Sequence, residues 1–265
     1  MKIMCIGDIV SVEGREMLFK TLPALKREYK PDFIIVNGEN AAIGNGIDEK
    51  SMREILSAGA DVITGGNHSL QKSAAGEVLE EMPMLLRPHN FGNTFGRGWY
   101  RLEGQKRDLL VINLQGMLYL PENENPFVCA EELLDKIATP RDIIVVDFHA
   151  EASSEKKAMG YFLDGRVSLV FGTHTHVLTA DETILPKGTG YITDIGMTGV
   201  QHSILGKDIA AAIHNFKYWG QAELRQKTKD AKGECLLCGI VAEMDEQSGK
   251  CTHIERICYT NLTKK

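Results

Sequence analysis

The stretch GTHTH, residues 172–176, places His174 and His176 two positions apart, directly after the apolar run SLVF. In an extended chain, residues i and i+2 point to the same side. We therefore expect the two imidazoles to lie side by side where a strand ends. Imidazole is a common ligand of Zn, Fe, Ni and Cu, so the pair can bind one metal ion or two neighbouring ions. A bare HxH also occurs as two histidines at a loop tip with no shared task, so the rest of the chain must decide.

Further side chains of metal-binding type also follow short apolar runs. In chain order they are Asp8, Glu39, Asn40, Asn67, His68 and His149. In open α/β sheets, ligands bind outside the carboxyl ends of the strands, which is where these residues would lie. Oxygen and imidazole donors without a required thiolate suit Mn, Fe, Zn or Co better than Ca or a structural zinc. The pattern therefore predicts a metal centre.

Eight candidate ligands are more than one four-coordinate ion needs, and they fit two ions that share a bridging carboxylate. Asp8 and Glu39 are the only carboxylates in the set, so one of them is expected to bridge. Two ions roughly 3.5–4 Å apart acidify a bridging water, and the resulting hydroxide attacks phosphorus while a histidine protonates the leaving oxygen. Taken singly, each candidate has a plain structural alternative as a cap, a turn residue or a core histidine.

The elements that must position these residues alternate between apolar runs and stretches of helical period. This alternation predicts an α/β fold with a sheet that is at least partly parallel. One helix is expected over residues 15–29, with a kink or break at Pro23. A second is expected from the N-cap Asp48 to about Gly59, and a third over residues 130–138.

The C-terminal part of the chain has a different pattern. CLLCGIVAEMD and CTHIERICYT flank the turn-like EQSGK, which predicts a β-hairpin over about residues 233–260. With no internal repeat and no convincing linker, residues 1–265 are expected to form a single domain. Cys235 and Cys238 form a CxxC, but buried, reduced thiols at strand positions are a better interpretation than a zinc site.

Composition limits the partners. The 265-residue chain is 43% apolar and 25% charged, with a net charge of −6, which argues against binding of long nucleic acid. We see no signal peptide and no apolar run near the ~18 residues of a membrane helix, so a cytoplasmic protein without membrane contact is expected. A homo-oligomer is compatible with the sequence.

Four motifs, GD at 7–8, GNH at 66–68, His149 and GTHTH, resemble the motif order of the calcineurin-like metallophosphoesterases. Val10 replaces the histidine of the usual D-x-H, NGEN replaces GDxxD, and Ser69 follows GNH. Together with NGENAA, LLRPHNF, DFHAEASSEK and LPKGTGYITDIGMTG, these departures resemble one subgroup, the YmdB-like bacterial metallophosphoesterases. The similarity extends from residue 1 to about 258.

This resemblance implies an αββα sandwich with a binuclear metal centre at the carboxyl ends of the strands. It also implies hydrolysis of small phosphodiesters, notably cyclic nucleotides such as 2′,3′-cyclic or 3′,5′-cyclic AMP. The metal ions are expected to be Fe or Mn, with Zn or Co as alternatives. By the resemblance, Glu39 bridges the two ions and His68 protonates the leaving oxygen. The other ligands would be Asp8, Asn40 and His176 for the first ion, and Asn67, His149 and His174 for the second.

The substrate is less determined than the metal centre. Two segments expected to border the pocket differ from the family, at Leu70 and Gln71 and at Gln201 and His202. Residues 196–199 are expected to form a tight loop near the substrate or a plain turn. A phosphomonoesterase or nucleotidase, and a nucleotide-binding regulatory protein with little turnover, therefore remain as alternatives. Arg87 and Arg166 are candidates for phosphate contact or for structural roles.

Overall fold

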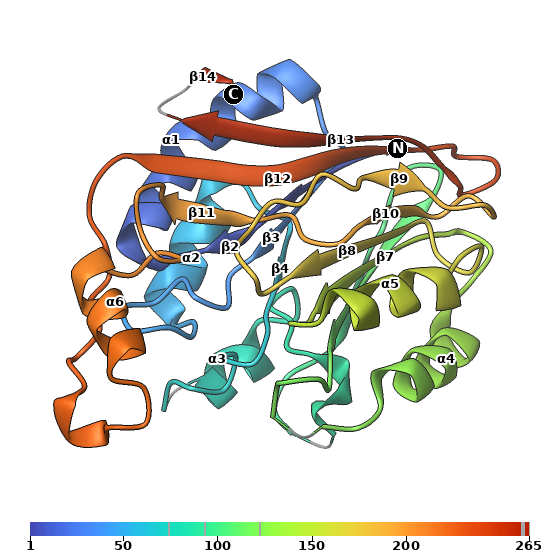
Figure 1. The fold of residues 1–265 in the computed structure, drawn as a ribbon. Helices are drawn as coiled ribbons and strands as arrows, with labels where there is room; N and C mark the ends of the chain where they lie inside the picture. The colour runs from blue at the N-terminus through green and yellow to red at the C-terminus, as the bar shows by residue number, and fades with distance from the viewer. Residues whose placement is uncertain (74, 93, 122, 261–262, 265) are drawn as a thin grey trace.

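The computed structural model describes residues 1–73, 75–92, 94–121, 123–260 and 263–264. It has two β-sheets that pack face to face, with helices on both outer faces (Figure 1). One buried cluster fills the layer between the sheets, and two others lie between a sheet and its helices. The predicted α/β class and the αββα layering are confirmed.

The first sheet has the order β14-β13-β12-β1-β3-β4, and β11 and β2 extend it beside β12. Its strands are β1 (Lys2–Ile6), β2 (Asp8–Ile9), β3 (Phe33–Asn37), β4 (Val62–Thr64), β11 (Met197–Val200), β12 (Cys235–Met244), β13 (Cys251–Thr260) and β14 (Thr263–Lys264). The strands β1, β3 and β4 are parallel. The helices α1 (Ser11–Tyr29) and α2 (Glu49–Ala58) make the crossovers that parallel pairing requires.

The second sheet has the order β5-β6-β7-β8-β10-β9. Its strands are β5 (Trp99–Leu102), β6 (Asp108–Gln115), β7 (Asp142–His149), β8 (Leu169–Thr173), β9 (Thr183–Ile184) and β10 (Gly190–Ile192). The four central strands run parallel, and α4 (Pro126–Ile137) and α5 (Ser153–Phe162) connect three of them. The remaining helical segments are α3 (Ala75–Glu81), α6 (Ile209–Lys217) and the 3₁₀ turns at His89–Phe91 and Ala222–Leu224.

Strand β1 shows why the four residues after Lys2 are all apolar. Ile3 and Cys5 face the layer between the sheets, whereas Met4 and Ile6 face the helix layer. Successive side chains of a strand point to opposite faces, so a strand covered on both sides has no solvent-facing position. The run IMCI is therefore buried at every position, and the chain becomes polar only where the strand ends.

The helices bear out one expectation and correct another. Helix α2 begins after Asp48, whose side chain and that of Ser51 form a reciprocal capping box, and Gly59 ends it with a φ of 113°. Pro23, however, does not break α1, which continues to Tyr29. Pro23 lies on the exposed side, where water can satisfy the carbonyl that proline leaves without a donor, while the buried leucines of the opposite face hold the helix in the core.

The C-terminal hairpin consists of β12 and β13, paired antiparallel. Two of its cysteines lie on opposite faces of the sheet and cannot share one metal ion: Cys235 packs on the helix side, and Cys251 lies between the two sheets. Residues Met197–Val200 form β11, paired with β12 and β2, so the expected loop or turn at 196–199 is wrong for most of its length. Across the described residues, no helix has both the length and the apolarity needed to cross a membrane.

Candidate metal centre

The structure brings the sequence-predicted residues together at one edge of the sandwich, where strands of both sheets end. The first sheet contributes side chains after β1, β3 and β4, and the second contributes side chains at the ends of β7 and β8. In chain order they are Asp8, Glu39, Asn40, Asn67, His68, His149, His174 and His176. Neither sheet alone supplies the set, so the site depends on how the two sheets pack.

Two groups of three residues have the spacing of metal ligands. Glu39, His149 and His174 form one group, and Asp8, Glu39 and His176 form the other, with the ligand atoms of each group within 4.8 Å of one another. Glu39 Oε2 lies 3.2 Å from His149 Nε2, and Asp8 Oδ1 lies 3.8 Å from His176 Nε2. Glu39 is the member common to both groups, which is the position a bridging carboxylate requires.

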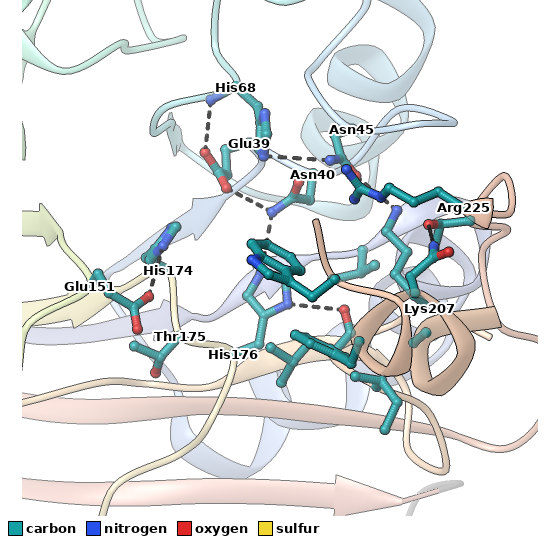
Figure 2. A pocket seen from close by; sticks show the side chains of 18 residues that line it. Glu39, Asn40, Asn45, His68, Glu151, His174, Thr175, His176, Lys207 and Arg225 are labelled. Carbon is teal, nitrogen blue, oxygen red and sulfur yellow. Dashed lines mark hydrogen bonds and ion pairs between the residues drawn. The ribbon is translucent and has the colours of Figure 1, made fainter. Parts of the chain in front are cut away.

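Two asparagines lie beside these groups. Asn40 Nδ2 is 2.7 Å from Glu39 Oε1 and 3.2 Å from His176 Nε2 (Figure 2). Asn67 Oδ1 is 3.0 Å from His149 Nε2. Each amide therefore adjoins a different one of the two groups.

A buried carboxylate oxygen tests whether these residues suit a metal ion. Asp8 is fully buried, and within the described part of the chain its Oδ1 has no hydrogen-bond partner. Burial raises the pKa of Asp8 well above its usual value. A bare buried oxygen is costly unless a donor or a cation satisfies it. The donor set of carboxylate, amide and imidazole groups therefore fits metal ions.

Charges inside the site set the protonation states of three candidate ligands. Burial by itself would raise the pKa of Glu39, but the charge and hydrogen bond of His149 lower it to about 2. Burial would likewise lower the pKa of His149, but Glu39 raises it to about 9. Burial and the neighbouring His149 lower the pKa of His174 to about 3. Before any metal binds, Glu39 is thus anionic, His149 is protonated and His174 is neutral.

The backbone that carries the two histidines of GTHTH is not extended, which corrects the expectation from the sequence. Strand β8 ends at Thr173, and His174 and His176 have φ values of 98° and 63°. Because of this path, the two imidazoles belong to different ligand groups. Left-handed conformations of non-glycine residues cost on the order of 1–3 kcal/mol each and persist only where surrounding contacts hold them.

A buried ion pair supplies such contacts. Lys156 Nζ donates to Asp194 Oδ2 at 2.6 Å and to the carbonyl of Thr173 at 2.8 Å. Asp194 Oδ2 also accepts from the backbone N–H of Thr175 at 3.1 Å and from its hydroxyl at 2.8 Å. Lys156 and Asp194 are both buried. The pair therefore binds the chain on both sides of His174, at Thr173 and at Thr175.

Hydrogen bonds outside the site orient its imidazoles. The Thr173 hydroxyl donates to Asp147 Oδ1 at 2.7 Å and lies 2.9 Å from His149 Nδ1. Its single hydrogen is thus used, so it accepts from Nδ1–H and leaves His149 Nε2 facing the site. Glu151 Oε2 lies 3.0 Å from His174 Nε2. The sequence analysis did not single out Thr173, Asp147 or Glu151, although Asp147 and Glu151 flank His149 by two residues.

Gly66 shows how closely the backbone approaches the ligands. A Cβ at this position would lie 2.3 Å from both Glu39 Oε2 and His149 Nε2. Only glycine leaves that space free. The GNH motif therefore needs its glycine for room beside the metal ligands.

A cavity of about 410 Å³ opens beside the site. Glu39, Asn40, His68, His174 and His176 form part of its wall. Much of the remainder comes from residues 204–228, in which the sequence analysis singled out no candidate site residue. Their available signal was the aromatic cluster in HNFKYW.

Several residues expected near the substrate lie elsewhere. The cavity wall does not include Leu70, Gln71, Gln201 or His202. Arg87 donates to the carbonyls of its own loop, including those of Pro88 and His89, and Arg166 pairs with Glu131 and Asp135. Of the two roles considered for these arginines, the structure favours the structural one.

The chain is similar to known proteins along nearly its whole length. The chain is 46% identical over 258 residues to a 2′,3′-cyclic-nucleotide 2′-phosphodiesterase of Bacillus subtilis (strain 168), covering 97% of this chain and 96% of that protein. A solved structure of a hypothetical protein from Thermus thermophilus is 35% identical with a TM-score of 0.90, covering 98% of this chain and 99% of its own. A phosphatase structure from Mycoplasma pneumoniae is 36% identical with a TM-score of 0.89, covering 98% of this chain and 93% of its own.

The family described as YmdB-like protein matches residues 4–257. This range includes all the predicted ligands and nearly the whole chain. The resemblance inferred from the motifs is therefore confirmed, and the chain belongs to the YmdB-like protein family.

Proposed function

We propose that this protein is a metal-dependent phosphodiesterase that hydrolyses small phosphodiesters, with 2′,3′-cyclic or 3′,5′-cyclic nucleotides as its substrates. The observation that carries the proposal is the position of Glu39 in both ligand groups. A carboxylate shared by two sets of ligands is the arrangement of two-metal phosphoester hydrolases. The phosphodiesterase relative from Bacillus subtilis, at 46% identity, supports the same activity.

We assign the ligands to two ions. Glu39 is common to both; Asp8, Asn40 and His176 complete the first, and Asn67, His149 and His174 complete the second. When bound, two such ions supply positive charge that polarises the phosphoester and acidifies water. The thiolate-free donor set favours Fe or Mn, with Zn or Co as the next candidates.

His68 is the residue we assign to proton transfer. It lines the cavity, and its backbone N–H lies 3.2 Å from Glu39 Oε2. Its Nε2 lies 3.4 Å from Asn45 Nδ2, and Lys207 Nζ donates to Asn45 Oδ1 at 2.8 Å. These neighbours hold the imidazole beside the ligands, where it can protonate the ribose oxygen that leaves phosphorus.

The test combines elemental analysis of the purified protein with hydrolysis assays before and after loading with Mn or Fe. We expect about two ions per chain and turnover that depends on them. Two ions without turnover would favour a nucleotide-binding regulatory protein. Failure to retain or regain metal would contradict the site itself.

A substrate panel separates the two hydrolase alternatives. It compares 2′,3′-cyclic AMP, 3′,5′-cyclic AMP, bis-p-nitrophenyl phosphate and p-nitrophenyl phosphate on the same metal-loaded preparation. We expect the diesters to be cleaved much faster than the monoester. The reverse order would identify a phosphomonoesterase.

A further inference from the structure

The wall of the cavity that lies away from the metal ligands has a chemistry of its own. Residues of α6 and of the segment after it form this wall, among them Phe216, Trp219 and Arg225. Figure 2 shows Lys207 and Arg225 together on one side of the pocket, and Glu151 and His174 on the other. The two ends of the cavity are thus continuous but different, with metal ligands at one and a cationic, aromatic surface at the other.

Two large aromatic side chains are exposed in this wall. Phe216 is 67% exposed and Trp219 is 72% exposed, although both line the cavity. Their ring planes differ by only 14°, with centroids 6.1 Å apart. Aromatic rings normally contribute to a core, so parallel rings left open beside a cavity offer flat faces to another planar ring.

The aromatic surface carries an unpaired positive charge. The Arg225 guanidinium lies 5.7 Å from the centroid of the Trp219 ring. No acidic partner of Arg225 occurs in the described ranges of the chain. Lys207, in contrast, is neutralised by Asp230 at 2.7 Å. The positive charge that remains available for a ligand therefore lies at the aromatic end.

Hydrogen bonds within this segment hold its residues in place, so this wall of the cavity has a defined structure. The Asp208 side chain caps α6 by accepting from the backbone N–H of Ala211 at 2.9 Å. Asn215 donates to the carbonyl of Gln226 at 3.0 Å and accepts from the backbone N–H of the same residue at 2.8 Å. These bonds tie the helix to the chain that follows Arg225, and so fix the rings relative to the guanidinium.

We propose that Phe216, Trp219 and Arg225 form the subsite for the nucleobase of the substrate, which makes the substrate class nucleoside cyclic phosphates rather than phosphodiesters of simple alcohols. The inference rests on the proposed function, because the metal centre must hold the phosphoryl group at the other end of the cavity. Nucleobases bind proteins by stacking on aromatic rings and under arginine, with little dependence on which base is present. The cavity volume lies within the usual range for small-ligand sites.

Kinetics with a matched baseless substrate provide the first test. The metal-loaded protein is assayed with 2′,3′-cyclic AMP and with methyl ribofuranoside 2′,3′-cyclic phosphate, which has the same reacting group and no base. We expect Trp219→Ala and Phe216→Ala each to raise KM for the nucleotide on the order of tenfold, because stacking is lost. The kcat value, and the kinetics of the baseless substrate, should stay unchanged.

Ile213→Ala is the control variant. Ile213 lies on the same helix and is 57% exposed, but it does not line the cavity. The Ile213→Ala variant should leave the kinetics with both substrates unchanged. Equal losses for both substrates in Trp219→Ala, or no loss for either, would overturn the base subsite.

Fluorescence gives a measurement that does not depend on hydrolysis. The protein has two tryptophans, Trp99 and Trp219, so Trp99→Phe leaves Trp219 as the single reporter. We expect adenosine to quench this fluorescence and ribose to leave it unchanged. Quenching in a protein that hydrolyses nothing would refute the proposed function and retain the subsite. Hydrolysis without quenching would retain the proposed function and refute the subsite. A Trp219→Ala variant that changes only the sedimentation coefficient would show an association surface and overturn the subsite.

Discussion

Glu39 is the residue on which both halves of the site depend. We predict that Glu39→Gln, which keeps the volume and removes the charge, lowers metal content and reduces turnover at least about 100-fold. Glu151→Gln is the graded comparison, because the Glu151 carboxylate pairs with the imidazole of one ligand, His174. The change should cost about 10- to 100-fold in metal affinity. Metal titration measures the loss of metal, hydrolysis assays measure the loss of turnover, and circular dichroism checks that the fold is retained. A Glu39→Gln protein with full metal content and activity would refute the bridging assignment.

The protonation state of His149 determines how metal binding is expected to depend on pH. Its pKa in the metal-free protein is about 9, whereas the pKa of Glu39 is about 2 and that of His174 about 3. A ligand imidazole must be neutral, so binding near pH 7 releases a proton from His149, and the proton competes with the metal. Apparent Mn affinity should therefore rise from pH 6.5 to about pH 9. Glu39 and His174 add nothing in this window, since both are already deprotonated. Asp8, whose pKa burial raises, also loses its proton more readily as the pH rises, so its effect has the same sign.

Calorimetry checks this prediction directly. Titrations of the metal-free protein with Mn at pH 7 in buffers of different ionisation enthalpy should show the release of about one proton for the His149 step. The His149→Asn variant is the control and should lose that component. An affinity that does not change between pH 6.5 and 9 would contradict the protonated state of His149.

The side chains of the site were predictable from residue types that recur after apolar runs, but the backbone at His174 was not. Local preferences favour negative φ for histidine, and the observed value of 98° is held by a contact from outside the loop. That contact joins Lys156 to Asp194, which are 38 residues apart in the chain. A single sequence gives no local sign of such a pairing.

At the scale of the elements, the buried pair of Lys156 on α5 and Asp194 after β10 is predicted to hold the end of β8. Removing one partner of a buried ion pair typically costs about 3–5 kcal/mol, because the other charge is left uncompensated. We expect Lys156→Met to lower the free energy of unfolding by about that amount and to weaken metal binding. Urea denaturation and metal titration measure the two effects.

The neighbouring Lys157 provides a matched control. It pairs with Asp181 at 3.5 Å but is exposed, so Lys157→Met should change stability by less than about 1 kcal/mol. Metal affinity should be unchanged in this variant. Equal effects at the two positions would show that the buried pair has no special role in positioning the histidines.

Elements were predictable where their signals are local. Asp48 and Gly59 act at the two ends of one helix, and they defined α2 correctly. The break considered at Pro23 does not occur. The cost of proline depends on whether its side of the helix faces water, which only the packed structure determines. Strand β11 was missed for a similar reason: Gly196 and Gly199 suggest a turn, but β12 and β2 on either side of the strand provide its hydrogen bonds.

At the scale of the whole molecule, the sequence predicted two kinds of layer but could not place one sheet on the other. The alternation of strands and helices is a local pattern, whereas the site needs His149 of the second sheet within 3.2 Å of Glu39 beside the first. The resemblance to a known family supplied that arrangement. The aromatic wall after residue 204 was outside every quoted motif, so neither the local sequence pattern nor the family resemblance identified it.

The position of the C-terminal hairpin leads us to propose that residues 1–265 fold as one unit. Strand β12 lies inside the first sheet, pairing with β1, β11 and β13, so the last strands of the chain complete the sheet that its first strand begins (Figure 1). Deleting residues 233–265 would leave β1 with an unpaired edge and expose Met4 and Ile6, which are buried on the helix side. We predict that this truncated chain has no cooperative unfolding transition and binds no metal.

Deleting only residues 261–265 is the control, because among the described strands β14 pairs with β13 alone and the rest of the sheet is retained. This shorter deletion should cost little stability. In the full chain with Trp219→Phe, Trp99 in the second sheet is the only tryptophan. Far-ultraviolet circular dichroism and fluorescence should then report one coincident transition in urea. A truncated protein that keeps a folded second sheet, or two separate transitions in the full chain, would mean that the sheets fold independently. The metal centre, which takes ligands from both, would then form only after they dock.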